Sequence, residues 1–163
     1  MISLSVDSSK DFMGKLLASD AFDSFLLEEA SIITAVTYSV SGRIHPDFFS
    51  DEDEKPAEEF IPWSQIRPRI FELIKGKNPP ISLRMTLLLR WSATNALLQK
   101  ESPEGHSEAF RAFVLNIRFE NGNVTLISGT SYDTFVPDKS LDIIWDETVK
   151  KFLTSKGIGF EIL

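Results

Sequence analysis

The fold is decided by two strands and a turn in residues 113 to 130, which read Phe-Val-Leu-Asn-Ile-Arg-Phe-Glu-Asn-Gly-Asn-Val-Thr-Leu-Ile-Ser-Gly-Thr. Asn121-Gly122 predicts a type I′ turn, because both central residues of that turn need positive φ. A slip of one residue would turn Arg118 and Asn116 toward the core, so the hydrophobic pattern determines the register. Counting outward from the turn pairs Phe119 with Val124, Ile117 with Leu126, Leu115 with Ser128, and Phe113 with Thr130.

Further elements follow from the same kind of periodicity, since period two indicates strands and a spacing of three or four indicates amphipathic helices. The expected strands are 2–6, 32–44, 81–91 and a terminal edge strand at 160–163, in addition to the hairpin. Four helices are expected. The first carries Phe12, Leu16 and Leu17 on one side, and the second spans 64–75. The third begins after Ser92, and the last runs from Asp138 or Ser140 to a stop at Gly157. Gly129 is the expected position of a β-bulge.

These strands alternate between apolar and polar residues, which predicts an antiparallel sheet with one face in water. Parallel strands buried on both faces would instead read as continuous apolar runs. We therefore expect a single α+β domain over residues 1–163. It would have a mainly antiparallel sheet of about five or six strands and three or four helices packed on one face.

Composition excludes several classes of function. The chain of 163 residues carries a formal charge of −7, which disfavours nucleic-acid binding and anionic membrane surfaces. It has no Cys, which excludes thiol nucleophiles, thiolate metal sites and disulfides. No secretory signal pattern precedes Lys10, and no apolar run approaches the length that crosses a bilayer. A cytoplasmic protein is expected.

Three stretches carry a resemblance. They are Asp11-Phe12-Met13 with Lys15-Leu16-Leu17, the run Phe71-Glu72-Leu73-Ile74-Lys75-Gly76-Lys77, and most of Phe113 to Leu153, including Trp145-Asp146-Glu147-Thr148-Val149. Across nearly its whole length the chain resembles a family of small proteins of unknown function from gut-dwelling Gram-positive bacteria. The resemblance implies a bacterial, cytoplasmic protein and brings no activity, cofactor or site residues.

The residues that could support catalysis or metal binding are few and scattered. His45 with Asp47, and His106, lack the second histidine at helical spacing that makes a metal motif. The acidic run at 51–54 lacks the alternating spacing of a calcium loop. The hydroxyls of 128–131 fit neither a phosphate loop nor a nucleophile elbow. No catalytic residue, metal or cofactor is predicted.

Charge is unevenly distributed along the chain. Residues 45–60 carry seven acidic side chains against one Lys, whereas residues 67–90 are basic. One hypothesis is an anion site on a basic sheet face, with Arg84 and Arg90 on one strand. The alternative is that the acidic loop 47–59 neutralises these charges. The candidate anion-binding residues are Arg67, Arg69, Arg84 and Arg90.

Four aromatic residues flank the acidic loop: Phe48, Phe49, Phe60 and Trp63. They either anchor the loop onto the body of the protein or present an apolar patch to a partner. The sequence therefore favours a non-catalytic protein-interaction or small regulatory module that uses this loop and the outer sheet face. The alternative is an enzyme or sensor that binds an anionic small molecule.

Overall fold

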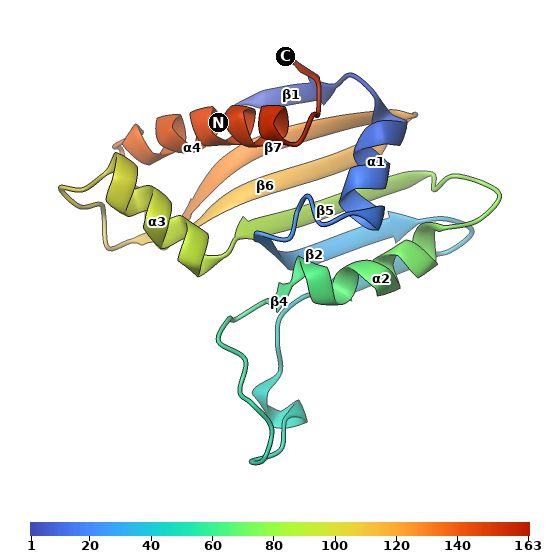
Figure 1. The fold of residues 1–163 in the computed structure, drawn as a ribbon, viewed down its shortest axis with the longest axis horizontal. Helices are drawn as coiled ribbons and strands as arrows, with labels where there is room; N and C mark the ends of the chain where they lie inside the picture. Colours follow the sequence, from blue (N-terminus) through green and yellow to red (C-terminus); the bar gives the residue numbers. More distant parts are fainter.

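The computed structural model describes all 163 residues, and Figure 1 shows a twisted sheet with helices over one side of it. The strands are β1 (Ser3–Val6), β2 (Phe25–Ile33), β3 (Thr37–Ser41), β4 (Ile61–Pro62), β5 (Ser82–Leu89), β6 (Phe110–Glu120), β7 (Asn123–Tyr132) and β8 (Phe160–Ile162). The helices are α1 (Ser9–Ala18), α2 (Trp63–Ile74), α3 (Trp91–Glu101) and α4 (Ser140–Ser155), with a short 3₁₀ helix at Pro46–Phe48.

Every strand pair is antiparallel, and the strand order is β3-β2-β5-β6-β7-β1-β8, with β4 paired to β2 outside this path. The hairpin of β6 and β7 has the predicted register at all four pairs. Asn121 and Gly122 turn the chain with φ of 53° and 77°, as a type I′ turn requires. The predicted antiparallel α+β class is confirmed.

One face of the sheet is the core. Alternate residues of β5, β6 and β7 point into it, and they meet the apolar stripes of the helices. The ring of Phe113 stacks on that of Trp145 from α4, with centroids 5.1 Å apart and planes inclined by 23°. The Trp145 indole N–H donates to the carbonyl of Val114 at 2.7 Å. The opposite face of the sheet, the open face, is not covered by helices (Figure 1).

The sheet has eight strands rather than five or six. The single strand expected at 32–44 is the end of β2, a turn at 34–36, and β3. Most of β2 escapes prediction because its register shifts between Leu27 and Glu29, which interrupts the period of two. The bulge expected at Gly129 is also wrong. Gly129 pairs regularly with Val114, and the irregularity of this hairpin lies between Phe110 and Ala112.

The helices begin within two residues of their predicted positions, and Gly157 ends the last one with φ of 71°. No helix combines the length and the apolar character that crossing a bilayer requires.

Residues 42–60, here called the arm, project away from the body of the protein between β3 and β4 (Figure 1). The base of the arm is held by a bridge between Arg43 and Phe60. The Arg43 guanidinium lies 4.9 Å from the Phe60 ring centroid and 2.5 Å from an oxygen of Glu59. These contacts of Arg43 with Phe60 and Glu59 hold the two ends of the arm together at its base.

Candidate functional site

A groove of about 390 Å³ lies where the open face meets the base of the arm. Its floor comes from three neighbouring strands: Leu26 of β2, Leu88 of β5 and Val114 of β6. Leu26 and Leu88 are only 5% and 8% exposed, although no helix covers this face. The groove thus has an apolar floor that is already largely shielded from water.

The walls of the groove are aromatic on two sides. Trp91, the first residue of α3, is 56% exposed, and Phe60 enters from the arm. A large apolar ring left this open to water is a common mark of an interaction surface. Because Arg43 covers part of Phe60, Trp91 is the more available of the two rings.

Glu28, on the bulge of β2, supplies the unpaired charge of the groove. Its carboxylate makes no ion pair and no hydrogen bond, while its backbone carbonyl accepts from Gly42 N–H at 2.8 Å. Burial raises the pKa of the Glu28 carboxyl, and the nearby carboxylates of Glu29 and Glu59 raise it further, while Arg43 opposes the rise. Perturbed carboxyls in a cleft are typical of binding and active sites.

A second acidic group of the groove, Glu58, is also partly buried, with a side chain that is 17% exposed. The nearest cation is Arg90, whose Nε is 3.8 Å from Glu58 Oε1. Arg90 Nε is buried and makes no hydrogen bond, so this pair is loose. The groove therefore combines an apolar floor with carboxylates that are not fully partnered.

These groups can bind a ligand, but they do not form a recognised catalytic set. His45 lies in the arm and His106 packs edge-on against Phe110 at 5.6 Å, both away from the groove lining. No three His, Cys, Asp or Glu side chains come together as metal ligands.

The four aromatic residues of the predicted interaction loop differ in location and exposure. Phe48 is 85% exposed near the tip of the arm, where its ring meets Phe49 at 5.5 Å. Phe60 lines the groove. Trp63 fits the anchoring alternative and not the exposed patch, because it is fully buried at the start of α2 and its indole N–H donates to the Leu16 carbonyl at 3.0 Å.

The four candidate arginines do not form one cluster. Arg67 lies on α2 and pairs with Asp23, and Arg69 is exposed on the same helix. Arg84 lies on the open face of β5, whereas Arg90 is beyond the end of that strand and precedes α3. The expected shared strand for Arg84 and Arg90 is therefore wrong. Of the acidic loop, Glu58 alone pairs with one of these arginines.

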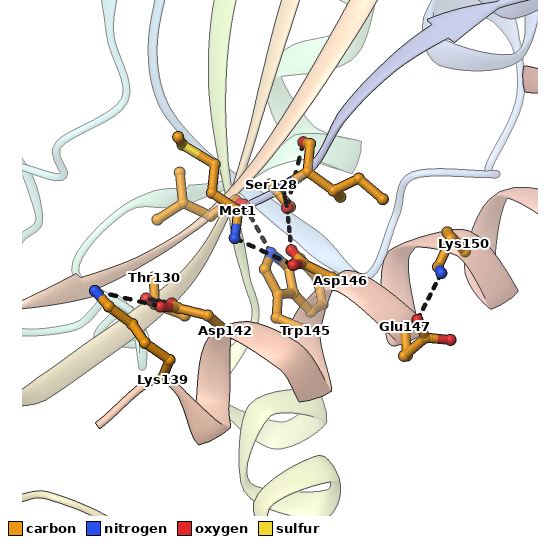
Figure 2. Close-up of polar contacts among 11 residues, drawn as sticks. Met1, Ser128, Thr130, Lys139, Asp142, Trp145, Asp146, Glu147 and Lys150 are labelled. Carbon is orange, nitrogen blue, oxygen red and sulfur yellow. Dashed lines mark hydrogen bonds and ion pairs between the residues drawn. The ribbon is translucent and has the colours of Figure 1, made fainter. Parts of the chain in front are cut away.

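Two hydroxyls of residues 128–131, those of Ser128 and Thr130, have structural partners (Figure 2). Ser128 is buried, accepts from the backbone N–H of Ile2 at 2.9 Å, and donates to Asp146 at 2.5 Å. Thr130 donates to Asp142 one turn earlier on α4. These bonds join α4 to β7, because each hydroxyl donates to a carboxylate of the helix.

The sequence analysis missed Glu28 and Trp91 as site residues. Trp91 continues the alternation of β5 in the sequence, and Glu28 lies in a run without clear period. No local pattern in the sequence relates Glu28 to Trp91, because only the pairing of β2 with β5 brings them to the same groove.

The fold defines a small α+β domain with an antiparallel sheet. The chain belongs to the family of unknown function DUF5721, which it matches over residues 15–161. No curated protein and no solved structure matches the chain.

Proposed function

We propose that this protein is a non-catalytic protein-binding module, and that its groove and arm bind one segment of a partner. The observation that carries this proposal is the exposed ring of Trp91, which lines a groove walled on another side by the arm. Burial of this ring by a partner would be favourable, at roughly 25 cal/mol per Å² of apolar surface.

The charges of this region indicate the chemistry of the partner segment. The arm carries seven acidic side chains, and the groove adds the unpaired carboxylate of Glu28. A segment with basic residues beside an apolar or aromatic residue would match both the charges and the floor. Phe48 at the exposed tip would enter an apolar pocket of the partner.

The proposal extends to the setting of the protein. The bacterial cytoplasm is the compartment that the resemblance implies, and a cytoplasmic partner protein fits it.

Affinity capture from cells that express the native protein tests the proposal. We expect a defined partner that is retained by the native chain, lost with Trp91→Ala, and weakened by Phe48→Ala. The matched control is Phe135→Ala, because Phe135 is also 85% exposed but lies outside the groove and the arm. Capture of the same proteins by all four chains would contradict the proposal.

A further inference from the structure

A second feature of the open face lies apart from the groove, in a row of residues that crosses the sheet. Arg84 of β5 is directly opposite Arg118 of β6. The row continues with hydroxyl side chains on both sides, as Ser31 of β2 opposes Arg84 and Thr125 of β7 opposes Arg118. Ser39 of β3 and Ser5 of β1 extend it outward.

The two arginines are an unusual pair. Both side chains are exposed, and neither takes part in any of the nine ion pairs or in a side-chain hydrogen bond. Residues directly opposite on an antiparallel sheet have Cβ atoms about 5 Å apart, and like charges there are destabilising. An anion between the two guanidinium groups would remove this repulsion and would accept hydrogen bonds from the N–H groups of both.

Beside Arg84 the open face is hollowed. A cavity of about 400 Å³ lies over β3, β2 and β5, where small side chains leave room. Its polar lining consists of Glu29, Ser31, Ser39, Ser41, Arg84 and Thr86. Hydroxyls and one carboxylate suit the hydroxyl groups of a ligand, and the volume falls within the range of small-molecule sites.

We propose that this row is a binding site for a small phosphate monoester that carries hydroxyl groups, such as a polyol phosphate. The phosphoryl group would lie between Arg84 and Arg118, and the hydroxyls of the ligand would face the serine-lined hollow. A dianionic phosphoryl group matches two guanidinium groups in charge, and its oxygens accept from both forks. The surrounding charge of −7 and the single arginine pair do not suit a nucleic-acid backbone.

This site is independent of the proposed function, because no residue of the row lines the groove at the base of the arm.

Titration of the full chain with glycerol 3-phosphate, followed by calorimetry and by backbone amide NMR, tests the site. We expect saturable binding, with signals moving in residues 31, 39, 84 and 118. Inorganic phosphate should bind more weakly, and sodium chloride at equal ionic strength should not reproduce the shifts. Absence of saturable binding, or equal shifts with chloride, would overturn the proposal.

Variants separate this site from general attraction of anions. Arg84→Gln and Arg118→Gln should each weaken glycerol 3-phosphate binding by about tenfold or more, since each removes charge-assisted hydrogen bonds. Arg69→Gln is the matched control, because Arg69 is exposed on α2 and makes no ion pair; its binding should equal that of the native chain. Equal weakening by all three variants would overturn the site.

The melting temperature of the ligand-free variants provides a readout that does not depend on the ligand. Removing one of two facing like charges should leave the melting temperature of Arg118→Gln equal to or above that of the native chain. A clear decrease in this melting temperature would show that the arginine pair stabilises the fold, and would contradict its assignment as a ligand site.

Discussion

The two faces of the sheet are built from the same strands, yet they carry opposite kinds of side chain. The covered face holds Phe113, Leu115 and Ile117 of β6, all at most 2% exposed. Alternating with them along β6, on the open face, are Val114, Asn116 and Arg118. The comparison suggests a division of labour, in which the covered face stabilises the fold and the open face is free to bind. Each prediction below tests this division.

The largest effect is expected on the covered face, for Trp145→Ala. This change removes the stack on Phe113 and the hydrogen bond to Val114, and it leaves a cavity between α4 and the sheet. We expect the free energy of unfolding to fall by about 3–5 kcal/mol. Urea denaturation measures it. Phe135→Ala, at an 85% exposed site, should change it by no more than about 0.5 kcal/mol; similar losses would contradict the division.

A smaller loss is expected where the open face joins the arm, for Gly42→Ala. A Cβ at this position would clash with the backbone carbonyl of Leu27, so the backbone of β2 or of the arm must move. We expect a loss of about 1–3 kcal/mol, as in overpacked sites. Denaturation measures the loss, and affinity capture should show weaker partner binding.

Gly14→Ala in α1 is the matched control for this substitution. A Cβ there meets nothing within 4 Å, and the residue lies inside a helix, so stability should rise by about 0.5–1 kcal/mol. If both glycine variants changed stability alike, close packing at Gly42 would not be the cause.

A pH-dependent effect is expected from Glu28. Since burial raises the pKa of this carboxyl in the folded protein, the folded state holds its proton to higher pH than the unfolded chain. The free energy of unfolding should therefore decrease as pH rises above the usual pKa of 4.5 and through the raised folded pKa. The decrease should be modest, because the group is only partly buried and water screens its charge.

The Glu28→Gln variant tests this pH dependence. An amide does not titrate, so the variant should lack this part of the decrease and should be at least as stable as the native chain near neutral pH. Denaturation at a series of pH values measures both chains. Parallel pH profiles would show that Glu28 is not the responsible group.

The smallest effect on stability is expected for Trp91→Ala. The ring is 56% exposed and lies on the rim of the groove, so the free energy of unfolding should change by about 0.5 kcal/mol or less. Loss of partner binding with unchanged stability would sharpen the contrast between the faces. A decrease in the free energy of unfolding of more than about 2 kcal/mol would instead show that Trp91 contributes to the core.

Local patterns predicted much of the fold. Asn121-Gly122 determined the hairpin register, because the turn chemistry and the alternating side chains agree. The apolar stripe predicted α4 and left its start open between Asp138 and Ser140; the stop at Gly157 followed from the glycine, which has positive φ just after the helix. β2 failed because its bulge hides the alternation, and β4 is too short to show a period.

The candidate sites were predicted less well. The sequence singled out Arg84 and Phe48, and both are exposed. It could not join Arg84 to Arg118, which is 34 residues later in the chain, since that neighbour depends on the register between β5 and β6. It also placed Trp63 in the loop, because an aromatic residue beside a charged run has the same local pattern whether it is buried or exposed.

By itself the sequence determined most of the helices and strands, the apolar side of the regular strands, and the absence of thiol chemistry. Those properties depend on neighbours within a few positions of the chain. The tertiary structure alone decided that the arm walls an apolar groove and that two arginines face each other without an ion-pair partner. The reason is that strand order and register, set by packing over the whole sheet, bring together residues that no local periodicity relates.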